Sequence, residues 1–314
     1  MKPVSEVKRI TVVGSINSDV TAYVREFPAH NQTVLAREST LTVGGKGLNQ
    51  AVAAACAGAE VTLIACVGDD VFGTMAQTYL KDKQVGISAV RQVAATASGT
   101  ANIMVSEGGD NMIAVAMGAN ACLSPEDIQR HKALIEASDV LIVQLEVPEE
   151  TVREALKVAR DAGVISILNP APALGSAGEL LRLADIVTPN ETETQEIANI
   201  YPGNPGDAAE AAEKLKQKGA RNIVITMGSA GYFYDLEGEA RFVPARKVEA
   251  LDPTGAGDVF NGVLAVALAK GKHSVLAAQY AAAAGALSVM RPGAEGAAPS
   301  WQEVETYLGG AGRI

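Results

Sequence analysis

Short apolar runs typical of buried strands recur along this chain and alternate with segments of helical pattern. These runs are residues 9–14, 61–67, 140–145, 164–168, 186–188 and 222–227. Between them, residues 149–162 and 208–218 carry helical patterns that stop at Gly163 and Gly219. Strands that alternate with helices predict an α/β fold: a central, mainly parallel sheet with helices on both faces.

The length of the chain suits one large domain. Its 314 residues can bury a core of that size, so we expect a single domain over residues 1–314. Apolar residues make up 48% of the chain and aromatic residues only 4%, which predicts a core of Ala, Val, Leu and Ile. The C-terminal third is expected to be helical, over residues 255–270 and about 273–290.

Two segments depart from this alternation. Residues 33–43 and 100–116 are expected to form antiparallel strands, the second segment folding about a turn at residues 107–110. We expect a small sheet, formed by about 20–43 and 97–118, that projects from the main domain. Flanking glycines favour a moving lid over a static extension used only for packing.

Charge and composition exclude several classes of function. The net charge is −10 and no block of Lys or Arg occurs, so binding to nucleic acid or to anionic membranes is not expected. No apolar run reaches about 18 residues, and the N-terminus lacks a signal-peptide pattern, which predicts a cytoplasmic protein. The three cysteines have no CxxC spacing and the three histidines are scattered, which argues against a zinc site.

Thr254-Gly255-Ala256-Gly257-Asp258 carries the strongest chemical signal. Small residues directly before a helix let backbone N–H groups converge on an anion. Asp258 could simply cap that helix, but capping does not require the small residues ahead of it. A base beside an anion hole is what phosphoryl transfer to an alcohol requires, so we interpret Asp258 as that base. The chain has no GxxxxGK[ST] motif, and Phe260 stands where a dinucleotide fingerprint needs Gly.

A second polar group lies near the N-terminus. Asn17 and Asp19 follow the first strand and are expected at its carboxyl edge, where ligands bind in open α/β sheets. A Gly-Gly-Lys-Gly-Leu-Asn-Gln run that contains Lys46 and Asn49 then precedes an alanine-rich helix expected over residues 51–57. These side chains offer the donors and acceptors that a ring of hydroxyls demands. The alternative is a glycine-rich turn in which Asn49 caps the helix.

Six segments together resemble the ribokinase family, within the phosphofructokinase B group of carbohydrate kinases. They occur in order over nearly the whole chain, at residues 14–19, 44–51, 169–172, 189–193, 226–231 and 252–258. The resemblance implies a ribokinase-like fold in which a sugar binds under the lid and ATP lies along the C-terminal part. It also implies a phosphotransferase with an alcohol group as acceptor.

The resemblance assigns a role to each matching residue. Asp258 would deprotonate the terminal hydroxyl of the sugar. The anion hole would be formed by Gly255, Ala256 and Gly257. The sugar site would be lined by Asn17, Asp19, Gly45, Lys46, Asn49, Glu146 and Asp258. The nucleotide site would be lined by Asn190, Thr226, Gly228, Ser229, Gly231 and Gly257.

Two cations are implied as well. Glu193, with Asn190, would hold Mg²⁺ through water molecules. A monovalent cation, K⁺, would be bound mostly through backbone carbonyls of Asp252, Thr254, Ser288, Arg291 and Gly293. Residues 294–297 lack the Ser often found near that cation in the family, which puts its last ligand in doubt.

The residues leave other interpretations open. Asn190 and Glu193 have the spacing of a helix capping box, Glu146 also fits a solvated loop acid, and Arg291 fits a surface charge. D-Ribose is the preferred acceptor; deoxyribose, another sugar or a nucleoside is the alternative. A non-catalytic sugar or nucleotide sensor and a dinucleotide-dependent oxidoreductase are the hypotheses from other classes. Lids in this family often pair, so a homodimer through the lid is expected.

Overall fold

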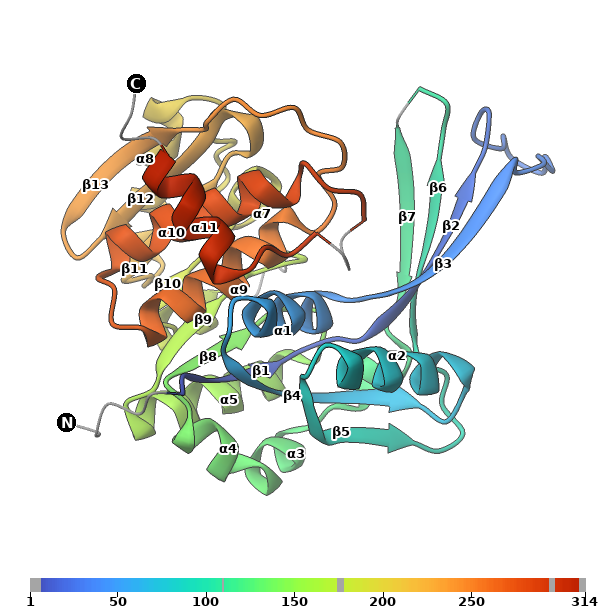
Figure 1. The fold of residues 1–314 in the computed structure, drawn as a ribbon, viewed down its shortest axis with the longest axis horizontal. Coiled ribbons are helices and arrows are strands. Elements are labelled where there is room, and N and C mark those ends of the chain that lie inside the picture. Colours follow the sequence, from blue (N-terminus) through green and yellow to red (C-terminus); the bar gives the residue numbers. More distant parts are fainter. Residues whose placement is uncertain (1–6, 109, 174–177, 294–296, 311–314) are drawn as a thin grey trace.

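The main body is built around a nine-stranded sheet (Figure 1). The computed structural model describes residues 7–108, 110–173, 178–293 and 297–310. In spatial order the strands are β13 (Glu239–Pro244), β12 (Gly231–Leu236), β11 (Asn222–Thr226), β10 (Ile186–Val187), β9 (Ile165–Leu168), β8 (Val140–Val143), β1 (Arg9–Val13), β4 (Glu60–Gly68) and β5 (Gly86–Val93). Neighbours from β11 to β5 pair in parallel, whereas β12 and β13 add an antiparallel edge. The sheet is therefore mainly parallel, as predicted.

Helices cover both faces of this sheet. One face carries α1 (Lys46–Cys56), α2 (Val71–Asp82), α9 (Ala256–Ala269), α10 (Ser274–Ser288) and α11 (Trp301–Gly309). The other carries α3 (Pro125–Arg130), α4 (Lys132–Ala137), α5 (Glu149–Ala162), α6 (Gly178–Leu183), α7 (Glu191–Ala198) and α8 (Pro205–Gln217). Within the described residues, no helix combines the length and hydrophobicity that crossing a bilayer would require.

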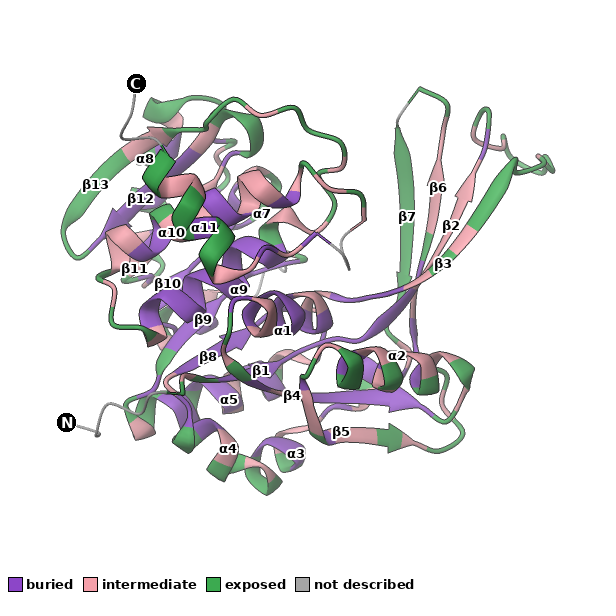
Figure 2. Ribbon diagram, viewed as in Figure 1, coloured by how far each residue is buried: buried purple, intermediate pink, exposed green. Residues whose placement is uncertain are grey.

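Strand β8 shows why the sequence contains uninterrupted apolar runs. Val140 and Ile142 pack in the core on one face, and Leu141 and Val143 pack in the core on the other. All four side chains are buried because helices cover both faces of the sheet at this strand. A strand buried on both faces is apolar at every position and does not alternate apolar with polar residues. In Figure 2 the central strands are coloured as buried and lie between the two helical layers.

The boundary of α1 differs from the expectation. The sequence predicted a helix from residue 51, whereas α1 begins at Lys46 and includes Gly47 and Asn49. The prediction was wrong because glycine and asparagine have low helix propensity and were interpreted as loop residues. Tertiary packing overrides that propensity here, since Gly47 and Leu48 are buried against the core.

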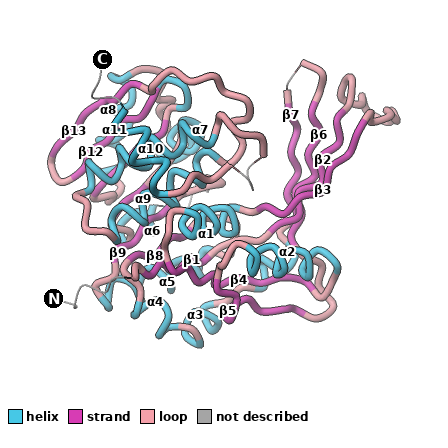
Figure 3. The backbone as a smooth tube through the Cα atoms, in the orientation of Figure 1, coloured by secondary structure: helices cyan, strands magenta, loops and turns pink. Residues whose placement is uncertain are grey.

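A separate four-stranded sheet projects from the body (Figure 3). Its order is β3 (Glu38–Gly44), β2 (Asn17–Tyr23), β6 (Gly99–Val105) and β7 (Asn111–Ala116). The pairs β2–β3 and β6–β7 are antiparallel, but the central pair β2–β6 is parallel, which the sequence did not predict. The turn expected at residues 107–110 joins β6 to β7, and its residue 109 lies outside the described part of the chain.

The start of β2 also corrects an expectation. Asn17 and Asp19 were expected at the carboxyl end of β1, but they belong to β2 and thus to the projecting sheet. Only three residues separate β1 from β2, so the chain passes directly from the main sheet into the smaller one. The two side chains therefore lie where the projecting sheet joins the body.

Candidate active site

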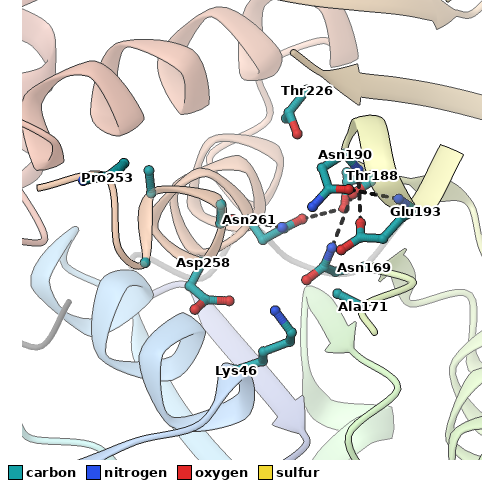
Figure 4. Close-up of a pocket in the computed structure, with 13 residues that line it drawn as sticks. Lys46, Asn169, Ala171, Thr188, Asn190, Glu193, Thr226, Pro253, Asp258 and Asn261 are labelled. Atoms are coloured by element: carbon teal, nitrogen blue, oxygen red, sulfur yellow. Dashed lines mark hydrogen bonds between the residues drawn. The ribbon is translucent and has the colours of Figure 1, made fainter. Parts of the chain in front are cut away.

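A cavity of about 170 Å³ lies beside the N-terminus of α9 and the carboxyl ends of β9, β10 and β11 (Figure 4). Ligands of parallel α/β sheets bind at this edge because strand ends and helix N-termini meet there. The cavity is lined by Lys46, Asn169, Ala171, Thr188, Asn190, Glu193, Thr226, Pro253, Gly255, Ala256, Gly257, Asp258 and Asn261. It thus unites residues that the sequence assigned separately to the sugar, nucleotide and anion sites.

The N-terminus of α9 is shaped to receive an anion. Gly255 caps the helix with φ of 76°, a left-handed conformation that favours glycine. A Cβ added to Gly257 would meet no atom within 4 Å, so the helix backbone there is open to an approaching ligand. The first-turn N–H groups of a helix lack intrahelical acceptors, and the helix dipole adds positive potential. This geometry fits the predicted anion hole.

Asp258 lies in the first turn of α9 and faces α1. Its Oδ2 accepts a hydrogen bond from Asn49 Nδ2 at 3.0 Å, and its Oδ1 accepts one from Gln50 Nε2 at 2.9 Å. The two helices approach closely because residue 262 is glycine: a Cβ there would lie 2.7 Å from Ala53 Cβ. The Asp258 carboxylate therefore bonds to another helix instead of capping its own.

Burial and charge act in opposite directions on this carboxyl. Burial raises the pKa of Asp258 above its usual value, and the Lys46 ammonium and the hydrogen bonds from Gln50 and Asn49 offset only part of that rise. For Lys46, burial alone would lower the pKa, but attraction to Asp258, Glu146 and Glu193 raises it overall. Lys46 therefore stays cationic, and in Figure 4 its side chain points into the cavity toward Asp258. A cation here suits a phosphorylated ligand.

Glu146 joins the end of β1 to the start of α1. Its Oε2 accepts hydrogen bonds from Ser15 Oγ at 2.5 Å, Lys46 N at 3.3 Å and Asn17 Nδ2 at 3.4 Å. These contacts exclude the interpretation of Glu146 as a solvated loop acid. They also show that one of its oxygens is committed to protein donors.

The remaining residues of the expected sugar site surround the start of the projecting sheet. Asn17 is buried, and the Asp19 carboxylate packs against Gly44. Gly45 is the N-cap of α1. Asn49 Oδ1 is buried and has no hydrogen-bond partner among the described residues. An unpaired buried acceptor is unfavourable, so this atom is suited to a donor supplied by a ligand such as a sugar hydroxyl.

Asn190 and Glu193 form the capping box of α7 and also line the cavity. Asn190 Oδ1 accepts from Glu193 N at 2.9 Å, and Glu193 Oε2 accepts from Asn190 N at 2.8 Å. The capping interpretation is therefore correct, and the cavity position leaves the functional one available. Burial raises the pKa of Glu193 to about 7, opposed by the hydrogen bond from Asn190 and by Lys46.

The cavity fits Mg²⁺ only together with a ligand. In the described part of the chain, no group of three or more His, Cys, Asp or Glu residues could hold a metal ion. Mg²⁺ keeps several waters and commonly binds one or two carboxylates plus substrate phosphates. Glu193, which lines the cavity, can supply such a carboxylate.

The other residues assigned to the nucleotide lie along the end of β11. Thr226 is the last residue of β11 and lines the cavity. Gly228 and Ser229 form a 3₁₀ turn (Gly228–Ala230), and Gly231 begins β12. These three residues follow Thr226 along the chain but do not line the cavity.

The residues expected to hold a monovalent cation lie on the loop before α9, at the end of α10 and on the loop that follows α10. Asp252 Oδ1 accepts from Thr254 N at 2.9 Å, and its Oδ2 accepts from Gly293 N at 3.0 Å. The N–H of Arg291 donates to the carbonyl of Ser288 at 3.0 Å. Asp252 therefore links the loop before α9 to the loop after α10 through Gly293.

These loops fit a hard cation, which prefers oxygen ligands such as backbone carbonyls. The side chain of Arg291 pairs with Glu303, so Arg291 can contribute only backbone atoms. Residues 294–296, within the 294–297 run that lacks a Ser, lie outside the described residues.

Sequence reasoning missed the polar side chains that support the site. They are Ser15, Gln50, Asn120, Gln144, Asn169, Thr188 and Asn261. All seven are buried. The available signal was a polar residue inside an otherwise apolar or glycine-rich run, because such a residue needs a partner once it is buried.

Comparisons with known proteins identify the family of the chain. Residues 7–301 match the family described as pfkB family carbohydrate kinase. The chain is 37% identical to a ribokinase of Haemophilus influenzae, over 96% of this chain and 98% of that one. It is 35% identical to a deoxyribokinase of Salmonella typhi, over 95% and 98%.

A solved structure extends the likeness to the fold. The structure of Arabidopsis thaliana ribokinase complexed with ribose and ATP matches with a TM-score of 0.89 and 28% identity, over 96% of this chain and 99% of that one. The resemblance inferred from the six sequence segments and the predicted fold class are thereby confirmed.

Proposed function

This chain belongs to the pfkB family of carbohydrate kinases, and we propose that it transfers the γ-phosphoryl group of ATP to the terminal hydroxyl of D-ribose. As a member it is a phosphotransferase with an alcohol group as acceptor. The observation that carries the proposal is the placement of Asp258 beside the open N-terminus of α9, in one cavity with Lys46 and Asn190. A non-catalytic sensor would not need a base at this position, and a dinucleotide-dependent oxidoreductase is disfavoured because Phe260 stands where its fingerprint needs Gly.

In the proposed reaction, the sugar oxygen attacks the γ-phosphorus while its proton passes to Asp258, and ADP leaves. The N-terminus of α9 and Lys46 stabilise the negative charge on the phosphoryl group. Closure of the projecting sheet over the sugar would align the reactants and exclude water. We propose that this sheet is the lid of a single kinase domain.

Two cations would assist. Mg²⁺, when bound near Glu193 with the phosphates of ATP, neutralises part of their charge. K⁺, when bound by the loops that Asp252 fastens, adds positive potential close to the anion hole. Because ATP is the co-substrate, we place the reaction in the cytoplasm.

Ribose is supported by the hydrogen-bonding groups at the base of the lid. Asn49 Oδ1 needs a donor, Asn17 and Asp19 lie nearby on β2, and each can bind a hydroxyl. A site built to bind a hydroxyl discriminates against the analogue that lacks it, because its own polar groups are then left unpaired. Deoxyribose is the second candidate, since the deoxyribokinase of Salmonella typhi is nearly as similar to this chain as the Haemophilus influenzae ribokinase.

A coupled assay of ADP release tests the proposal across a panel of pentoses, ketoses and nucleosides. We expect kcat/KM for D-ribose to exceed that for 2-deoxyribose by at least about tenfold, the effect of one lost hydrogen bond of about 1.4 kcal/mol. Equal or better turnover of deoxyribose would replace the substrate but keep the reaction. Failure to phosphorylate any member of the panel would favour the sensor hypothesis.

The lid also supports a proposed homodimer. Leu41, Met112, Ile113 and Val115 expose about half of their surface, and all four lie on the projecting sheet. All six residues of the edge strand β7 are exposed (Figure 2). An exposed apolar sheet of this kind is typical of an interface, and a second copy of the lid has the same character.

A further inference from the structure

Gln50 is a fully buried glutamine, and each polar atom of its side chain has a partner. Its Nε2 donates to Asp258 Oδ1 at 2.9 Å and to Asn169 Oδ1 at 3.0 Å. Its Oε1 accepts from Gln144 Nε2 at 2.6 Å. Gln50 does not line the cavity, so it can influence a reaction there only through its partners.

The hydrogen bonds continue from Asn169 and return to α9. Asn169 Nδ2 donates to the Thr188 carbonyl at 3.1 Å, and Thr188 Oγ1 donates to Asn261 Oδ1 at 2.6 Å. Asn261 Nδ2 then donates to the Gly257 carbonyl at 2.8 Å. Figure 4 shows the part of this path between Asn169 and Asn261 along the cavity wall. The path leaves Asp258 through Gln50 and ends at the carbonyl of Gly257, the residue next to Asp258 in the sequence, so it forms a closed ring.

The direction of the hydrogen bonds in this ring suits an ionised Asp258. An ionised carboxylate can only accept hydrogen bonds, so the atom of Gln50 that faces it must be the donor Nε2. The Oε1 of Gln50 then needs a donor, which Gln144 supplies. A buried amide with all its partners in place has a single favourable orientation.

From this ring we propose that Gln50 is a positioning residue of the phosphoryl transfer, which holds Asp258 ionised and in one orientation. The inference rests on the proposed role of Asp258 as the base, but not on ribose as the substrate. Gln50 and Asn49 each bind one carboxylate oxygen, so the carboxylate cannot rotate without losing both bonds. A Gln50 that serves only to pack α1 against α9 is the competing explanation.

The charges around Asp258 set the size of the expected effect. Lys46 of α1 favours the ionised carboxylate, whereas Glu146 after β8 and Glu193 of α7 oppose it. A hydrogen bond to a charged group corresponds to roughly one pKa unit or more. Replacement of Gln50 by Met keeps the length of the side chain and removes the donor. The Asp258 carboxyl should therefore titrate at least about one unit higher.

The test compares wild type with Gln50→Met, using whichever panel sugar the wild type phosphorylates. We expect the acidic limb of the kcat–pH profile to move up by at least about one pH unit, so that kcat measured below the midpoint of the wild-type limb falls about tenfold. KM for ATP should change by less than about twofold, because Gln50 does not touch the cavity. An unchanged acidic limb would overturn the proposal.

Two further variants guard against a purely structural effect. Gln50→Met combined with Gln144→Leu removes the donor that the single substitution leaves unpaired, so it should recover thermal stability but keep the shifted limb. Ser166→Ala removes a buried hydroxyl that donates to Asp185 at 2.9 Å on β9, away from the base. It should lose stability without moving the limb. If the shift of the acidic limb of the kcat–pH profile parallels the loss of thermal stability across all three variants, the proposal would also be overturned.

An activity-independent measurement separates this inference from the proposed function. In protein labelled with ¹³C at aspartate carboxyls, the Asp258 signal can be assigned by its loss in Asp258→Asn. Its titration midpoint should rise in Gln50→Met and stay unchanged in Ser166→Ala. If the wild type phosphorylates no sugar, the proposed function fails while this titration still decides whether Gln50 controls Asp258. An unmoved midpoint overturns the inference, whatever the substrate.

Discussion

Asn120 donates from Nδ2 to Oδ1 of Asn17, 2.8 Å away, at the point where the projecting sheet leaves the body. The same amide binds the backbone of Ile16 on both sides: its Oδ1 accepts from Ile16 N and its Nδ2 donates to Ile16 O. Because a backbone N–H can only donate, the orientation of the Asn120 amide is fixed. Asn120 therefore occupies the acceptor of Asn17 and leaves its donor, Nδ2, for Glu146 and a ligand.

We expect Asn120→Leu to weaken sugar binding, because the change removes these hydrogen bonds at similar side-chain size and frees the Asn17 amide to turn. KM for the sugar should rise by about tenfold or more, while KM for ATP stays within about twofold. Steady-state kinetics with each substrate varied provide the measurement. Asn222→Leu is the matched control, since Asn222 also bridges two backbone groups but at the start of β11. Equal changes in both variants would contradict a specific role for Asn120.

Asp258→Asn should nearly abolish turnover and spare nucleotide binding. The amide cannot accept the hydroxyl proton, so kcat should fall by roughly 10²–10⁴-fold. The Kd for ADP, measured by calorimetry, should change by less than about twofold. Asp127→Asn is the control. Asp127 is a buried acid that pairs with Arg91, and it is far from Asp258 in the sequence, so its replacement should affect stability alone. Near-normal activity of Asp258→Asn would exclude the proposed mechanism.

The sequence predicted the layers of the fold because strands that are buried on both faces consist of uninterrupted apolar residues. All four residues of β8 are apolar, and the Gly-Ala-Gly-Asp segment at the N-terminus of α9 joins small residues to a carboxylate. The antiparallel edge β12–β13 and the parallel pairing of β2 with β6 could not be predicted. Strand order depends on long-range packing that local patterns do not encode.

The supporting side chains of the site could not be predicted for a related reason. Gln50 lies within a motif that was recognised, yet its function depends on Asp258, which is 208 residues away in sequence. Two further members of the ring, Thr188 and Asn261, are far apart in the sequence, and only the folded chain shows that they meet. The hydrogen-bond partners of buried polar side chains are therefore set by the tertiary structure and cannot be found from the local sequence.

The buried carboxyl of Glu193 should make stability depend on pH in the ligand-free protein. Its pKa is raised from 4.5 to about 7, mainly by burial, so the folded state binds the proton more tightly than the unfolded state. The stabilisation that this provides is complete below about pH 4.5 and is lost as pH rises through about 7. The loss amounts to about 3 kcal/mol.

Glu193→Gln keeps the capping box but cannot ionise, so it isolates this effect. Urea unfolding without nucleotide or Mg²⁺ should show the variant as stable as wild type below pH 4.5 and more stable above pH 7, by up to about 3 kcal/mol. A constant difference between the two proteins across this range would show that Glu193 does not titrate there.

Removal of Asp252 should abolish activation by K⁺. Asp252→Ala removes the hydrogen bond from Gly293 that links the two segments and the one from Thr254 that holds its own loop, so the backbone there should lose its fixed arrangement. We expect kcat/KM in KCl to fall to its value in tetramethylammonium chloride of the same ionic strength. Glu303→Ala is the control, because it removes the ion pair of Arg291 but leaves the backbone in place. Loss of K⁺ activation in Glu303→Ala would contradict binding through backbone carbonyls.

The exposed edge strand β7 of the projecting sheet should control the oligomeric state. Ile113, at the centre of β7, is 56% exposed, and Ile113→Glu would place an unpaired charge in the proposed interface. Each substitution occurs twice in a symmetric dimer, so the dimer Kd should rise by at least about a hundredfold. Sedimentation at several concentrations would measure it. Val71→Glu makes the same change on α2, where the side chain is 73% exposed, and should leave the dimer intact. A wild type that sediments as a 32.4 kDa species at every concentration would exclude the dimer.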